Sequence, residues 1–128
     1  SYEELAAVTG AGHRVVNSYG SYLNQQKPFG YSVYAYQDTW KAFYTLSDPT
    51  TNQTLTPAQE ALIVGLSVSQ WVIQTDAANL FANTWPRSAA LAERAWSPRA
   101  DVNTTAAEPR LEAWRCALTQ RGVPAARW

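Results

Sequence analysis

The sequence contains no methionine, one cysteine and one histidine among its 128 residues. Because methionine is absent even from position 1, we expect the chain to be a piece of a longer product. The single cysteine, Cys116, excludes a disulfide bond within the chain. Two interpretations of it stay open: a small buried apolar residue, or a thiol that is free or bridged to another chain.

Neither sign of charge dominates, since ten Lys and Arg residues balance ten Asp and Glu residues. Nucleic-acid binders usually carry a basic excess, so we expect no nucleic-acid partner. No apolar run approaches the ~18 residues of a membrane-spanning helix, so we expect no membrane span. With 46% hydrophobic and 16% charged residues, the composition is typical of a folded chain, and the length allows one domain at most.

Familiar catalytic motifs are also missing. There is no glycine-rich phosphate loop and no Gly-x-Ser-x-Gly turn. His13 has no cluster of cysteines or carboxylates around it, which argues against a metal site. Glu3 and Glu4 fit the solvated start of a helix better than a catalytic pair. The residues alone therefore predict no complete catalytic set, no metal site and no cofactor.

The first part of the chain predicts a helix followed by a strand. Apolar residues at helical spacing predict a helix over 3–9, and Gly12 follows it in a turn. The β-branched run over 14–18 predicts a short buried strand. The stretch from 19 to about 37 is irregular and rich in tyrosine, and a loop of that length is often functional. Three aromatic residues then follow at helical spacing, and we expect one short helical turn to bury them: Trp40, Phe43 and Tyr44.

A second helix and strand follow. Thr56 and Gln59 form a capping box with Pro57 at the first helical position. We expect a second buried strand within 63–71, although periodicity does not fix where the helix ends and the strand begins. Residues 79–83 are expected to form a loop.

Two helices close the sequence. The first begins at Pro86 and ends before Ser97 and Pro98. The last begins near Thr105, with Glu108 completing a second capping box. Its apolar stripe consists of Leu111, Trp114 and Leu118, and Gly122 and Pro124 end it.

This order of elements is typical of two βα units of a parallel α/β fold. Strands of parallel sheets are buried on both faces, and two of them do not form a stable sheet alone. We therefore expect this chain to need more protein to complete its core. Two sequons, at Asn52 and Asn103, lie in polar, turn-like stretches that could carry glycans. Since about one sequon is expected by chance, they favour secretion only weakly.

One long motif is far more specific. Residues 85–97 read WPRSAALAERAWS, which closely resembles the WPRAAAxAERLWS signature of glycoside hydrolase family 20, the β-N-acetylhexosaminidases. Other segments resemble the family in register: 12–24, 65–80 and 111–124, together with Trp40, Tyr44, Asp48 and Pro49. The resemblance covers essentially the whole chain.

The resemblance implies an α/β fold, as the C-terminal portion of a TIM-type (β/α)8 barrel. Residues 1–128 would supply about the last two βα units plus a terminal helix of one catalytic domain. The family removes terminal β-linked N-acetylhexosamine with retention, because the acetamido oxygen of the substrate attacks the anomeric carbon. The Asp-Glu pair that orients the acetamido group and protonates the leaving group lies upstream. It would come from a partner chain or a missing segment, in an assembly that we expect to be oligomeric.

The resemblance also implies roles for three residues. Tyr22 matches the tyrosine that hydrogen-bonds the acetamido group and stabilises the oxazolinium intermediate. Trp71 matches a tryptophan that walls the sugar pocket. Asn24 stands where the family usually has Asp and would contact sugar hydroxyls. Ordinary packing is the alternative for Tyr22 and Trp71.

Three departures from the family pattern affect the same pocket. Ser21 replaces a tryptophan, Ser67 replaces a glutamate, and Ile73 replaces the glutamate that binds the O4 and O6 hydroxyls. Losing such an acceptor leaves polar groups unpaired, at a cost of roughly 1–3 kcal/mol. A catalytically eroded family member with a structural or glycan-binding role is therefore the alternative function.

The resemblance also has implications for Cys116 and for the cellular location of the protein. Cys116 matches a cysteine that typically pairs with another at the extreme C-terminus, for which this sequence offers no partner. Family members occur in lysosomes and outside cells. We therefore expect the secretory pathway, with a glycan as substrate or ligand.

Overall fold

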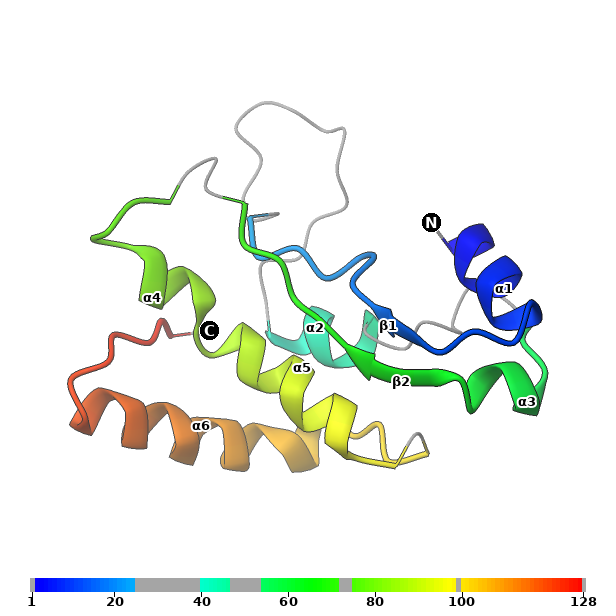
Figure 1. Ribbon diagram of the computed structural model, residues 1–128. Helices are drawn as coiled ribbons and strands as arrows, with labels where there is room; N and C mark the ends of the chain where they lie inside the picture. The colour runs from blue at the N-terminus through cyan, green and yellow to red at the C-terminus, as the bar shows by residue number, and fades with distance from the viewer. Residues whose placement is uncertain (1, 25–39, 47–53, 72–74, 99, 128) are drawn as a thin grey trace.

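The computed structural model describes residues 2–24, 40–46, 54–71, 75–98 and 100–127. Within them a two-stranded parallel sheet is flanked by helices (Figure 1). The elements are α1 (Tyr2–Gly10), β1 (Val15–Asn17), α2 (Trp40–Leu46), α3 (Pro57–Glu60), β2 (Ile63–Leu66), α4 (Leu80–Thr84), α5 (Arg87–Trp96) and α6 (Thr104–Gln120). The predicted order of two strands among helices is confirmed.

The parallel pairing of the two predicted strands is also confirmed. Val15 pairs with Ile63, and after a one-residue irregularity Val16 pairs with Gly65. The ladder continues past the strands, because the Ser67 N–H donates to the Asn17 carbonyl at 2.8 Å. Each strand is shorter than the sequence predicted, since regular pairing ends at Asn17 and at Leu66.

The local signals before the strands act as predicted. Gly12 has φ +85°, a left-handed conformation that favours glycine and lets the chain turn from α1 into β1. The Gln59 N–H donates to Thr56 Oγ1 at 3.3 Å, and the Thr56 N–H donates to Gln59 Oε1 at 3.0 Å, which completes the capping box of α3. Gln59 Nε2 also donates to the Ala6 carbonyl at 3.1 Å, so the cap joins α3 to α1.

Two sequence predictions about the later helices are wrong. Residues 79–83 are not a loop, because 80–83 belong to α4 and Asn79 is its N-cap. The Asp76 carboxylate accepts hydrogen bonds from the N–H groups of Ala78 and Asn79, at 2.9 and 3.2 Å, just before that helix. The cap of α6 is Asn103 rather than Thr105, because Asn103 Oδ1 accepts the Ala106 N–H at 3.0 Å.

The core lies on one side of the sheet, where α5 packs against both β2 and α2. Trp40, Phe43 and Tyr44 are 1–2% exposed, which confirms their predicted burial. They contact the small and apolar residues of neighbouring elements: Leu23, Ala90, Leu91, Ala107 and Leu111. The cluster joins α2, α5 and α6 to the chain that follows β1.

The strands themselves are not buried on both faces within this chain. Val16 is 60% exposed and Val64 is 46% exposed. The described residues supply packing helices for only part of the sheet, so the two strands predicted as buried remain partly exposed in this chain. In the part of the chain that is described, no helix combines the length and hydropathy needed to cross a membrane.

Candidate functional site

The predicted sugar-binding residues lie in two neighbouring segments beyond the strands. Tyr22 and Ser69 form a parallel bridge. The Ser69 N–H donates to the Ser21 carbonyl at 2.9 Å, and the Leu23 N–H donates to the Ser69 carbonyl at 2.9 Å. Because parallel strands end at the same edge of a sheet, this ladder brings the segment of Tyr22 and the segment of Trp71 together there.

The side chains of this edge differ in exposure. Trp71 is 60% exposed. Tyr22 is half-buried. Asn24 is also half-buried, and its Oδ1 atom is buried without a hydrogen-bond donor among the described residues. A buried acceptor without a donor costs about 1–3 kcal/mol, so this oxygen suits a donor supplied by a ligand or by further protein.

A second such acceptor, Gln70, has no signal in the sequence pattern. Its Nε2 donates to Thr75 Oγ1 at 2.5 Å, and Asn83 Nδ2 donates to the same hydroxyl at 3.3 Å. Its Oε1 is buried and has no donor within the described ranges. These bonds link the end of the β2 segment to α4, next to Trp71.

The three departures from the family pattern have different surroundings. Ser21 is 4% exposed, and its carbonyl takes part in the ladder. Ser67 is half-buried. Ile73 lies outside the described residues, as does the sequon asparagine Asn52.

The two other residues considered in the sequence, His13 and Cys116, lie on other parts of the surface. His13 is exposed after α1, and its N–H donates to the Val8 carbonyl at 3.2 Å. Among the described residues no three His, Cys, Asp or Glu side chains gather as metal ligands would. Cys116 is exposed, with Sγ 3.8 Å from Glu112 Oε1, so the interpretation as a buried apolar residue is wrong.

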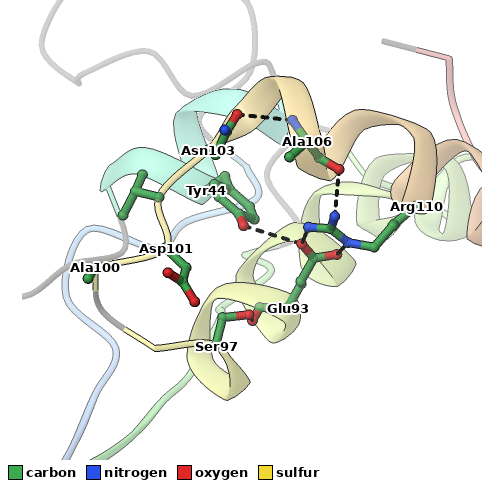
Figure 2. A pocket seen from close by; sticks show the side chains of 9 residues that line it. Tyr44, Glu93, Ser97, Ala100, Asp101, Asn103, Ala106 and Arg110 are labelled. Atoms are coloured by element: carbon green, nitrogen blue, oxygen red, sulfur yellow. Dashed lines mark hydrogen bonds and ion pairs between the residues drawn. The ribbon is translucent and has the colours of Figure 1, made fainter.

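Sequence reasoning missed a charged cluster where α2, α5 and α6 meet (Figure 2). The Tyr44 hydroxyl donates to Glu93 Oε1 at 3.2 Å, and Arg110 Nη2 donates to the same oxygen at 2.6 Å. Burial, together with the neighbouring Glu93 carboxylate, raises the pKa of Tyr44 above its usual 10.0. Glu93 is 49 positions from Tyr44 and 17 from Arg110, so no local spacing marks the cluster.

An open hollow of about 820 Å³ adjoins this cluster. Its lining comes from the last turn of α5, the first turns of α6, the link between them, and α2: Tyr44, Glu93, Ser97, Ala100, Asp101, Val102, Asn103, Ala106 and Arg110. Neither the segment of Tyr22 nor the segment from Ser69 to Trp71 contributes to this lining, so the hollow is separate from the edge that carries Tyr22 and Trp71.

Two arginines of the WPR…AER motif support the scaffold, whereas Glu93 of the same motif lines the hollow. Arg87 is 5% exposed, donates to the Asn83 carbonyl, and its guanidinium lies 5.6 Å from the Phe43 ring centre. Arg94, also 5% exposed, donates to the Pro98 carbonyl at 3.0 Å beyond the end of α5. Both arginines satisfy carbonyls at helix ends, which explains why a motif so rich in arginine lies inside the core.

Comparison with known proteins identifies the family to which the chain is similar. Residues 1–99 match the model of the glycosyl hydrolase family 20 catalytic domain. The chain is 37% identical over 123 residues to the beta-hexosaminidase subunit alpha of Rattus norvegicus, covering 96% of this chain and 21% of that protein. It is 33% identical over 123 residues to the beta-hexosaminidase subunit A1 of Dictyostelium discoideum, covering 96% of this chain and 22% of that protein.

A solved structure agrees with these relatives. The chitobiase of Flavobacterium johnsoniae matches with a TM-score of 0.72 at 25% identity, over 95% of this chain and 17% of its own. The chain thus spans about a fifth of the length of the curated relatives it matches. Its mixed α/β structure corresponds to part of a TIM-barrel catalytic domain, and the chain belongs to glycosyl hydrolase family 20.

Proposed function

We propose that residues 1–128 are the C-terminal portion of one family 20 catalytic barrel, comprising its last two βα units and a terminal helix. The assembled protein removes terminal β-linked N-acetylhexosamine from glycans by the substrate-assisted retaining mechanism. The observation that carries this proposal is the bridge between Tyr22 and Ser69, which brings Tyr22 and Trp71 to one sheet edge. Active sites of parallel barrels form at the carboxyl ends of their strands.

Each residue of this edge has a definite task in the proposal. The Tyr22 hydroxyl donates a hydrogen bond to the substrate acetamido oxygen and holds it against the anomeric carbon. That bond strengthens as the oxazolinium ion forms, which lowers the barrier. The exposed indole of Trp71 packs on the sugar ring, and Asn24 binds sugar hydroxyls.

The Asp-Glu pair that orients the acetamido group and protonates the leaving oxygen belongs to the rest of the barrel. That part is a separate chain or another segment of the same product, and the assembly is oligomeric. The exposed strand residues Val16 and Val64 support this requirement, because they are apolar positions on which further protein can pack. We place the assembled protein in the secretory pathway, in lysosomes or outside the cell.

A catalytically eroded protein with a structural or glycan-binding role is the second candidate. Ser67 and Ile73 favour it, since each stands where the family has a glutamate. Without the carboxylate at position 73, the O4 and O6 hydroxyls of the sugar lose a charged acceptor, which weakens binding.

Hydrolysis of an aryl β-N-acetylglucosaminide separates the two functions. The protein is purified natively with all co-purifying chains retained, and release of the aryl group is followed. Turnover supports the enzyme and shows that the site tolerates Ile73. A well-folded preparation without turnover contradicts it and favours the eroded protein.

Substitution of Tyr22 tests its role in an active preparation. Tyr22→Phe should lower kcat at least tenfold, because the hydroxyl acts most strongly in the transition state, while Tm changes little. Tyr19→Phe is the matched control, since Tyr19 is also partly exposed but lies before the ladder. A Tyr22→Phe variant whose kcat falls only as much as its lowered Tm explains would contradict a catalytic role.

A further inference from the structure

The hollow beside α6 is lined by Asn103, an asparagine in the sequence pattern for N-linked glycosylation. Asn103, Thr104 and Thr105 form an Asn-x-Thr sequon with no proline in the middle position. Asn103 and Thr105 are both exposed. The Asn103 side chain lies at the hollow, in the link that leads from α5 into α6 (Figure 2).

Of the two polar atoms in the Asn103 side-chain amide, one makes a hydrogen bond within the described part of the chain and the other does not. Oδ1 accepts the Ala106 N–H at 3.0 Å and caps α6. Nδ2 donates to no group within the described part of the chain. N-linked sugars attach through this nitrogen, so the cap and the modification use different atoms of one side chain.

We propose that Asn103 carries an N-linked glycan through Nδ2 while its Oδ1 continues to cap α6. The co-reactant is a lipid-linked oligosaccharyl pyrophosphate. Nδ2 loses a proton and forms a bond to the anomeric carbon of the first N-acetylglucosamine. The bond from that carbon to the pyrophosphate oxygen breaks, and the leaving pyrophosphate keeps the electron pair.

The surroundings of Asn103 leave room for the first sugar. The hollow of about 820 Å³ is open, and Asp101, Ser97 and Arg110 offer groups that can hydrogen-bond sugar hydroxyls. Glu93 already accepts hydrogen bonds from Tyr44 and Arg110, so it does not need the sugar as a partner. This inference rests on the secretory route proposed above, because the sugar donor is available only there.

Mass spectrometry of one tryptic peptide tests the proposal. Cleavage after Arg99 and Arg110 releases residues 100–110, in which Asn103 is the single asparagine. The protein is purified from its secretory source, digested, and treated with peptide N-glycanase in heavy-oxygen water. We expect this peptide to appear as a glycopeptide before treatment and afterwards in its labelled form, with the asparagine converted to aspartate.

The second sequon distinguishes the possible failures. Glycan on Asn52 with an unmodified 100–110 peptide overturns this inference and leaves the secretory route standing. Both asparagines unmodified overturns the inference and the secretory route together. Neither result depends on catalytic activity, so the test is separate from the aryl glycoside assay.

Three variants of the whole protein separate the glycan from the cap. Thr105→Ala should lose the glycan but keep the cap, and Thr105→Ser should keep both. Asn103→Ala should lose both and melt at a lower temperature than Thr105→Ala. Both variants lack the glycan, so equal melting temperatures for Asn103→Ala and Thr105→Ala would overturn the claim that Oδ1 caps α6.

Discussion

Tyr44 shows how a single side chain connects three helices. Its ring is 1% exposed in the core, edge-on to Trp40 with ring centres 6.1 Å apart. Its hydroxyl reaches the Glu93 carboxylate of α5, which Arg110 of α6 also binds. The phenol thus has an apolar end in the core and a polar end at the hollow, and both contribute to holding α2 in place.

Replacing Tyr44 by Phe tests the polar end alone. Tyr44→Phe should lower the free energy of unfolding by about 1.5 kcal/mol, because it removes one hydrogen bond to a charged group and keeps the ring. Denaturant unfolding of the assembled protein at pH 7 measures it. Tyr19→Phe should have a smaller effect, and a larger loss there would contradict the special role of Tyr44.

The same hydroxyl predicts a pH dependence. Because its pKa is raised above 10.0, the folded protein holds the phenolic proton more tightly than the unfolded chain does. The resulting stabilisation is present below pH 10 and is lost as the pH rises through the folded-state pKa. The stability difference between wild type and Tyr44→Phe should therefore narrow above pH 10 in denaturant titrations. A difference that widens there would contradict this assignment.

At the scale of elements, helix caps determine where the chain changes direction. The capping box at Thr56 follows the local sequence pattern and forms as that pattern predicts. The start of α6 does not follow the pattern at Thr105, although Glu108 is correctly spaced. Glu108 instead pairs with Lys41 Nζ at 3.1 Å, and Asn103 supplies the cap. The local sequence thus contains two possible caps, and the helix begins at the earlier one, where asparagine is the stronger N-cap residue.

Removal of the Thr56 cap tests its contribution. Thr56→Ala should lower the free energy of unfolding by about 1 kcal/mol, since the first turn of α3 loses an acceptor. Thr56→Ser keeps the hydroxyl and should be close to wild type. Urea unfolding of the assembled protein compares them, and equal losses in both variants would show that the methyl group matters instead.

The packing of α6 onto the core depends on Leu111, which is 2% exposed. Leu111→Ala should cost about 2–5 kcal/mol because it leaves a cavity among Trp40, Phe43 and Ala90. The control is Ala113→Gly on the exposed face of α6, which should cost about 1 kcal/mol through helix propensity alone. Thermal unfolding compares them, and a Leu111→Ala loss no larger than that of the control would contradict tight packing.

At the scale of the whole molecule, the chain is an incomplete structure. Its described sheet has two strands, and Val16 and Val64 remain exposed. The order of helices and strands could be predicted from the sequence because periodicity and glycine turns are local. The cluster of Tyr44, Glu93 and Arg110 could not, because Glu93 is 49 positions from Tyr44. The buried acceptors of Asn24 and Gln70 could not either, because no local pattern marks a side-chain oxygen that lacks a donor. Tyr22 and Trp71 are identified through the family resemblance rather than through spacing.

The 128-residue chain expressed alone should not unfold cooperatively. Two strands with exposed apolar residues bury too little surface to offset the entropy of ordering the chain. Circular dichroism during heating should show a broad, sloping change, and the chain should aggregate or bind hydrophobic dyes. A sharp thermal transition of the isolated chain would contradict this prediction.

The ladder beyond the strands has a mechanical consequence. The Ser69 peptide is held on both sides by the segment from Ser21 to Leu23, through two hydrogen bonds of 2.9 Å. Trp71 is two residues farther along, so a ligand that displaces its backbone pulls on Ser69 and thereby on Tyr22. The positions of Trp71 and Tyr22 are therefore coupled through the backbone at Ser69. If the two side chains bind a sugar as proposed, a ring too bulky for Trp71 would displace Tyr22 as well.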